Sequence, residues 1–198
     1  MTEIMKSGML GEITFARSEF VFDGRQSARN WLWNKKTAGG GPLYDIGIHC
    51  LDTMRCILGD DEVVAVQSMH RLSGNKEETE RTNLLSLRFK KGNVGSIYTS
   101  YEPPYYRSFI EIVGTEGAMA AYNFIPSNVI VTLEIRSTKD NTVEAIHEEK
   151  IVIPDLYDLE VSHFSDCILN NMEPIVSNAS SLHNQYILEK ALTSANEN

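Results

Sequence analysis

The chain has 198 residues, of which 42% are hydrophobic and 23% charged, and its net charge is −9. This length allows a substantial core, and the composition is ordinary for a globular protein. The negative charge argues against a general partner among nucleic acids or anionic membranes. No apolar run approaches the ~20 residues of a membrane span, and the N-terminus lacks the regions of a signal peptide. Three scattered cysteines do not make a disulfide framework, so we expect a cytoplasmic protein.

The first part of the chain predicts a mixture of elements. A helical turn over residues 3–8 closes at Gly8, and a strand follows over 10–22. Residues 23–38 are polar and loop-like, and two tryptophans in this stretch are expected to anchor it. A helix of about four turns is predicted over 42–58, because Pro42 suits a first helical position and Gly59 is a stop signal.

Strands dominate the middle of the chain, and two helices end it. The polar stretch 73–80 is expected to be an exposed loop, and residues 90–93 form a hairpin turn. Apolar spacing predicts a helix over 155–170, and Ser177 or Asn178 caps a last helix. The predicted strands are 63–72, 83–89, 94–101, 107–113, 118–124, 129–135 and 143–153.

This order of elements predicts one α+β domain over residues 1–198, because the sequence contains no convincing linker or internal repeat. The expected architecture is a large, mostly antiparallel, open-faced sheet with helices packed on one face. Several strands are apolar on both sides of the pleat; Ile110 and Ile112, for example, alternate with Phe109 and Val113. We therefore expect a homo-oligomer in which another subunit covers the open face.

The helix over 42–58 has two different sides. At ~100° per residue, Asp45, His49 and Asp52 fall in one narrow stripe opposite the apolar residues. One interpretation is a solvated face, as on any amphipathic helix. Another is a proton-transfer site, in which the carboxylates sit beside an imidazole. A third is a small metal-dependent hydrolase, because one histidine and two carboxylates can hold a metal. Spacing alone leaves these alternatives open.

Several motifs of cofactor binding are absent. The sequence has no GxGxxG after a strand, no Walker-type phosphate loop, no paired CxxC spacing and no GxSxG. The glycines at 39–41 precede a helix and could pass for a phosphate cradle. However, the Asp45 carboxylate in the first turn would repel a phosphate there.

The segment Gly39-Gly40-Gly41-x-x-x-Asp45-x-Gly47-x-His49-x-x-Asp52 resembles the GGGxxxDxGxHxxD signature of the glucose–fructose oxidoreductase / inositol dehydrogenase / rhizopine-catabolism (Gfo/Idh/MocA) family. The resemblance extends to residues 7–13, to Trp31, to the turn at 114–117 and to residues 174–177. It thus covers nearly all of the chain. Leu32 and Asn34 depart from it, since many relatives have arginine and aspartate there.

The resemblance implies that this chain is only the second of two domains. The family's first domain is a Rossmann fold that binds NAD or NADP and carries a catalytic lysine, and this chain does not resemble it. Residues 1–198 would be a substrate-binding and oligomerisation domain. No cofactor-binding residue and no metal ligand is assigned to this chain, and we expect it to be inactive without its Rossmann partner.

By the same resemblance, His49 and Asp45 are the expected catalytic residues for hydride transfer from a sugar or polyol CH–OH. His49 would remove the hydroxyl proton, and Asp45 would bind the adjacent hydroxyl. Further candidates for substrate binding are Asp52, Tyr105, Arg107 and His163, although tyrosines near a strand end are also common as packing. The alternative function is a stand-alone sugar-binding or oligomerisation module without redox activity.

Overall fold

The computed structural model describes residues 1–125, 130–139 and 142–196. Its eight strands form one sheet in the order β2-β3-β4-β1-β5-β6-β7-β8. Within this part of the chain, β1 and β4 pair in parallel and the other neighbouring strands pair antiparallel. The strands are β1 Ile13–Val21, β2 Val63–Arg71, β3 Thr82–Phe89, β4 Val94–Ser100, β5 Arg107–Gly114, β6 Gly117–Tyr122, β7 Ile130–Lys139 and β8 Thr142–Val152.

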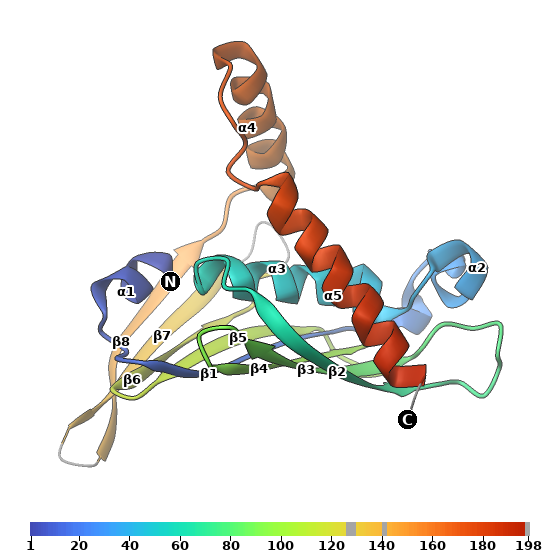
Figure 1. The fold of residues 1–198 in the computed structure, drawn as a ribbon, viewed down its shortest axis with the longest axis horizontal. Coiled ribbons are helices and arrows are strands. Elements are labelled where there is room, and N and C mark those ends of the chain that lie inside the picture. Colours follow the sequence, from blue (N-terminus) through green and yellow to red (C-terminus); the bar gives the residue numbers. More distant parts are fainter. Residues whose placement is uncertain (126–129, 140–141, 197–198) are drawn as a thin grey trace.

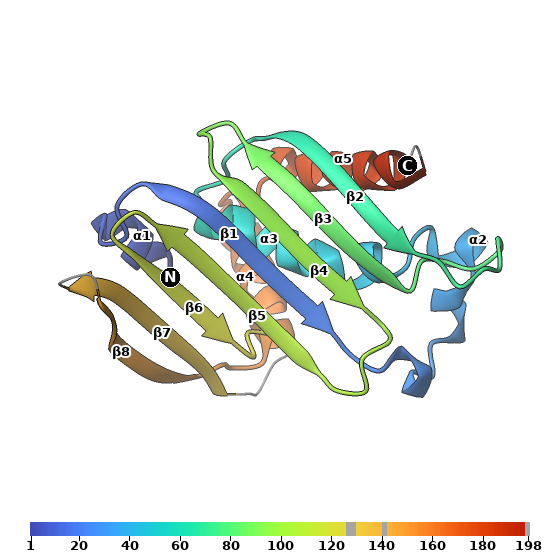
Figure 2. The ribbon, with the colours of Figure 1, turned by 90° about the horizontal axis from the view of Figure 1, so that it is seen from below.

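Helices cover one face of this sheet and leave the other face open (Figures 1 and 2). Helix α3 packs on β1, and the long C-terminal helix α5 packs on the edge strand β2. The α-helices are α1 Thr2–Ser7, α2 Lys35–Ala38, α3 Ile48–Ile57, α4 Leu156–Asn170 and α5 Asn178–Asn196. Three short turns of other helix types are η1 Gly24–Gln26, η2 Asn30–Trp33 and η3 Leu43–Gly47. The expected fold class is confirmed.

The core lies between α3 and the sheet. On β3, Leu85, Leu87 and Phe89 alternate with exposed residues and are all buried. The apolar side predicted for the helix after Pro42 is buried throughout: Leu43, Ile46, Cys50, Leu51, Met54, Ile57 and Leu58. Amphipathic spacing therefore identified correctly which side of this helix meets the sheet.

Helix α4 differs from the packed helices, because it stands away from the sheet (Figure 1). Asp155 caps its first turn, and Asn171 ends it in the left-handed region at φ 50°. The helix is therefore where the sequence predicts it. Its apolar residues, however, are exposed, and of the fifteen helical residues only Cys167 is buried.

Two loop expectations need correction. The stretch 73–80 is not exposed to its end, because Thr79 and Glu80 are buried. The two tryptophans near the start of the chain differ, since Trp33 packs on the body of the domain while Trp31 is 51% exposed. The predicted strand start at residue 129 and the chain reversal at 140–141 lie outside the described residues.

Candidate functional site

The helix that carries Asp45 and His49 begins with a π-type turn, η3, and becomes α-helical only at Ile48. We predicted a continuous α-helix from residue 42, so this is a correction. A π turn places one more residue in the turn than an α-helix does, and single π turns inside helices often occur at functional sites. The extra residue rotates Asp45 relative to the residues of α3, a feature that a uniform helical period cannot predict.

A buried carboxylate holds the start of this turn. Glu80, which precedes β3, accepts hydrogen bonds from the backbone N–H of Gly41 at 2.8 Å and of Leu43 at 3.1 Å. Its residue is 3% exposed, and burial raises its pKa although the two N–H donors oppose the rise. A Cβ on Gly41 would lie 2.2 Å from the carbonyl oxygen of Glu80, so this approach requires glycine.

This contact bears on the suspected phosphate cradle. The N–H groups at the start of a helix bind anions when they are free. Here the carboxylate of Glu80 already occupies two of them. The glycine turn is therefore anchored by the residue that precedes β3, and these two N–H groups are not free to bind an anion.

Two side chains hold the Asp45 carboxylate. The hydroxyl of Tyr101 donates to Oδ2 at 2.9 Å, and the guanidinium of Arg29 donates to Oδ1 at 3.1 Å and to Oδ2 at 3.4 Å. Tyr101 is buried, whereas 47% of the Arg29 side chain is exposed. Burial and the Asp45 charge raise the pKa of Tyr101, so its hydroxyl remains a proton donor across the physiological range.

His49 lies four residues after Asp45 and is exposed. Within 1–125, 130–139 and 142–196, the structure shows no hydrogen bond or ion pair to its ring. The turn thus combines a carboxylate held by protein groups with an imidazole that is accessible to an incoming ligand. Such a pair can bind one hydroxyl group and accept the proton of another.

The other candidate residues have partners elsewhere. Asp52 accepts a hydrogen bond from Asn184 of α5 at 2.7 Å, and the buried Arg55 donates to the same Asn184. Arg107 pairs with Glu19 of the neighbouring strand, with 2.7 Å between Nε and Oε1. His163 of α4 accepts from the backbone N–H of residue 175 at 3.1 Å. Tyr105 is exposed in the turn between β4 and β5.

Asp45 lies in η3 and His49 follows four residues later in α3, so their catalytic role stays a prediction. Asp52, Arg107 and His163 have protein partners of their own. A substrate contact by these three or by Tyr105 stays a prediction. The metal-site alternative gains no support from this geometry. Among the described residues, no group of three or more His, Cys, Asp or Glu side chains could hold a metal ion.

Sequence reasoning missed part of this site. Tyr101 belongs to a run of aromatic residues near a strand end, which was the one available signal for it. Arg29 lies in a polar loop with other cations, and Glu80 lies in a stretch that we expected to be exposed. Neither has a local pattern that indicates its partner.

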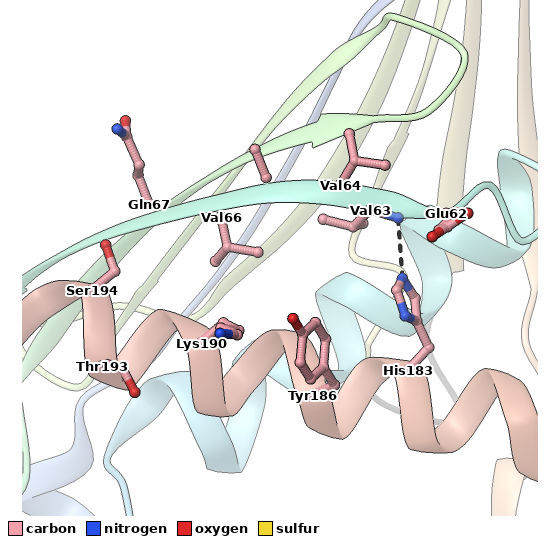
Figure 3. Close-up of a pocket in the computed structure, with 11 residues that line it drawn as sticks. Glu62, Val63, Val64, Val66, Gln67, His183, Tyr186, Lys190, Thr193 and Ser194 are labelled. Carbon is pink, nitrogen blue, oxygen red and sulfur yellow. Dashed lines mark hydrogen bonds between the residues drawn. The ribbon is translucent and has the colours of Figure 1, made fainter.

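A hollow of about 910 Å³ lies between β2 and α5 (Figure 3), and neither Asp45 nor His49 lines it. His183 at one end of it accepts a hydrogen bond from the backbone N–H of Val63 at 3.0 Å. Tyr186 and Lys190 line its floor on α5, and the amine of Lys190 lies 5.5 Å from the Tyr186 ring centre. Size alone does not indicate chemistry, so we assign the candidate site to the turn with the carboxylate and the imidazole.

Comparison with known proteins identifies the family of the chain. Residues 1–120 match the model of the GFO/IDH/MocA C-terminal domain. The chain belongs to this family. Its relatives include 1,5-anhydro-D-fructose reductase of Ensifer adhaerens, 24% identical over 88% of this chain and 51% of the relative. Another is scyllo-inositol 2-dehydrogenase (NAD(+)) of Bacillus subtilis, 29% identical over 70% of this chain and 40% of the relative.

Solved structures of two oxidoreductases share the fold. Aldose-aldose oxidoreductase from Caulobacter crescentus, complexed with glycerol, superposes with a TM-score of 0.82 at 23% identity, covering 99% of this chain and 57% of that one. Levoglucosan dehydrogenase in complex with NADH superposes with a TM-score of 0.79 at 19% identity, and the match covers 99% of this chain and 60% of that one. The chain thus spans about half the length of the relatives it matches. Within the described residues, no helix is long and apolar enough to cross a membrane.

Proposed function

We propose that this chain is the substrate-binding half of an NAD(P)-dependent oxidoreductase that acts on a CH–OH group of a sugar or polyol. The observation that carries this proposal is the Asp45 carboxylate, fixed by Tyr101 and Arg29, one turn before an accessible His49. The names of the matched relatives, which describe reductases and dehydrogenases of sugars and inositol, support the substrate class.

The chemistry assigned to this chain is proton transfer. When an alcohol carbon loses hydride, its hydroxyl must lose a proton to form the carbonyl. The imidazole of His49 takes this proton, and the Asp45 carboxylate accepts a hydrogen bond from the neighbouring hydroxyl to orient the substrate. We assign the hydride acceptor to a second domain, because the chain spans about half the length of its relatives and the N–H groups of its glycine turn already bond Glu80. We therefore expect no turnover by this chain alone.

Helix α4 supports the need for a second domain. Tyr157, Val161, Phe164 and Ile168 follow a four-three-four spacing, and each is at least 60% exposed. Exposed apolar surface of this kind marks an interaction site. Residues 151–189 contain acidic side chains and no lysine or arginine. We propose that the Rossmann cofactor domain packs on this helix through an apolar patch with a basic rim.

We further propose that the open sheet face forms a homo-oligomer contact. Met69 and Leu84 are paired neighbours on this face, and both are exposed. Val94, opposite Arg88 at the other end of β3, is also exposed. The Arg17–Glu111 ion pair at 2.6 Å adds a charged part to the same face. A protein that sediments as a monomer at micromolar concentration, with or without Leu84→Lys, would contradict this contact.

Titration with neutral sugars tests the proposed function directly. The probes are scyllo-inositol and 1,5-anhydro-D-fructose, the compounds in the names of the two relatives. We expect calorimetry to show saturable binding of at least one, and Asp45→Asn to weaken it ten- to hundredfold, because a hydrogen bond to a charged group is worth about 1.5–3 kcal/mol. The matched control, Asp166→Asn on α4, should leave the affinity unchanged.

The same samples test the cofactor assignment. NADH fluorescence should show no binding up to millimolar concentration, because no described group of this chain cradles the pyrophosphate. Sugar binding that is indifferent to Asp45→Asn would contradict the proposed site. Saturable micromolar NADH binding would contradict the assignment of the cofactor to another domain, and turnover by the purified chain would contradict the expected inactivity.

A further inference from the structure

Tyr101 is built into the protein more firmly than any other contact of Asp45. Its residue is 1% exposed, and its ring packs at 5.2 Å from Phe22 and edge-on at 5.3 Å from Trp33, between ring centres. Its backbone N–H donates to the carbonyl of Arg81, and its carbonyl accepts from the N–H of Gly24. A Cβ on Gly24 would lie 2.7 Å from the Tyr101 Cβ, so the surroundings leave this ring no free space.

Arg29 contacts the same carboxylate from a different setting. It precedes η2 in a polar loop, its side chain is 47% exposed, and its two hydrogen bonds are longer, at 3.1 and 3.4 Å. Because about half of its side chain meets solvent, the Arg29 guanidinium is held less tightly than the buried Tyr101 hydroxyl. A ligand that approaches Asp45 from solvent therefore meets the Arg29 side and not the Tyr101 side.

We propose that Tyr101 is a positioning residue that holds Oδ2 of Asp45, so that Oδ1 is the oxygen offered to the substrate hydroxyl. Arg29 is the partner that yields to the substrate. This assignment rests on the proposed function and deepens it, because it distinguishes the two oxygens of one carboxylate. Tyr101 itself takes no part in proton transfer, since a buried phenol beside a carboxylate keeps its proton.

The first test compares Tyr101→Phe with a matched control. Tyr122→Phe removes the same hydroxyl from a second tyrosine–carboxylate pair, Tyr122 and Glu134, which are 3.4 Å apart on β6 and β7. Side-chain coupling constants from NMR should show one χ1 rotamer for Asp45 in the wild type and in Tyr122→Phe, and averaged rotamers in Tyr101→Phe. A single unchanged rotamer in Tyr101→Phe would overturn the proposal.

Sugar affinity gives the second test. Tyr101→Phe should weaken binding of the neutral sugar about tenfold, whereas Arg29→Gln should change it less than threefold. A larger loss in Arg29→Gln than in Tyr101→Phe would overturn the assignment of the two oxygens. Unchanged thermal unfolding in Tyr101→Phe separates positioning from a loss of fold.

A wild-type measurement keeps the proposal testable if Tyr101→Phe does not fold. The Tyr101 hydroxyl proton should exchange slowly enough to be seen in a proton spectrum, with a nuclear Overhauser contact to the Asp45 side chain. Absence of this contact would contradict the proposal. If the wild-type chain binds no sugar, the proposed function fails, and the Asp45 rotamer still decides what Tyr101 does.

Discussion

Helices α3 and α4 have similar apolar content and opposite surroundings. In α3, Cys50, Leu51 and Met54 are completely buried against the sheet. In α4, Phe164 and Ile168 are 60% and 66% exposed, and the helix extends away from the body of the domain (Figure 1). Periodicity predicts that both helices have an apolar side. It does not say whether the surface that covers this side belongs to the same chain.

The two helices differ in what covers their apolar sides. The α3 side is closed by the domain's own sheet, and beside it the buried Tyr101 holds the Asp45 carboxylate. The α4 side lacks a cover within the described residues, so its apolar surface contributes little to the stability of this chain. Substitutions in the two helices test whether the apolar side of α3 contributes more to the stability of this chain than that of α4.

The largest expected effect is in α3. Leu51→Ala removes a fully buried side chain and should lower the free energy of unfolding by about 2–5 kcal/mol, because the core loses buried area and keeps a cavity. Phe164→Ala in α4 should change it by less than about 0.5 kcal/mol, as is usual for exposed sites. Urea unfolding of the two variants measures both values.

A larger loss of unfolding free energy in Phe164→Ala than in Leu51→Ala would contradict this difference between the helices. A loss of more than about 2 kcal/mol in Phe164→Ala would mean that the isolated chain already covers α4, for example by self-association. Repeating the measurement at two protein concentrations separates these cases, because stabilisation by association depends on concentration.

The same contrast marks the limit of the sequence analysis. The apolar side of this helix was predictable, since the apolar residues from Leu43 to Leu58 recur at helical spacing, whereas the start of α3 at Ile48 was not. The four-residue separation of Asp45 and His49 is local, and their catalytic role stays a prediction. The contacts from Glu80 and Tyr101 were not predictable, since they join residues 37–56 positions apart. Nor was the π turn, because apolar spacing does not register one extra residue in a single turn.

A smaller effect is expected at the anchor of the site. Glu80→Ala leaves two buried N–H groups without an acceptor, which costs about 1–3 kcal/mol. Glu80→Gln keeps a hydrogen-bond acceptor and removes the titratable carboxyl, so the difference between the wild type and this variant reports the titration of Glu80. Burial raises the folded pKa above its ordinary 4.5, so the wild type is relatively most stable below that pH. Its stability relative to Glu80→Gln should fall as the pH rises from 4.5 through the raised pKa.

Urea unfolding of the wild type and Glu80→Gln between pH 4 and 8 measures this difference. Contributions of other groups cancel in the comparison when they are far from residue 80. A tenfold change in the protonation equilibrium corresponds to about 1.4 kcal/mol, well above the error of such a difference. A stability difference that does not change with pH across this range would show that the pKa of Glu80 is the same in the folded and unfolded states, which would contradict the prediction.

The smallest expected effect concerns how α5 attaches to β2. His183 accepts from the N–H of Val63, and burial followed by the charge of Arg55 lowers its pKa below 6.5 (Figure 3). A base with a lowered folded pKa stabilises the fold above its ordinary pKa, and this contribution is lost as the pH falls through the folded value. His183→Gln removes this dependence. The wild type should therefore lose about 0.5–1.5 kcal/mol of unfolding free energy relative to His183→Gln below pH 6.5.

His70 also has a lowered pKa, and His70→Gln is the control for its contribution. If the loss of stability below pH 6.5 persists in His183→Gln and disappears only in His70→Gln, the titrating group is His70 and the proposed role of His183 at the α5 attachment is wrong.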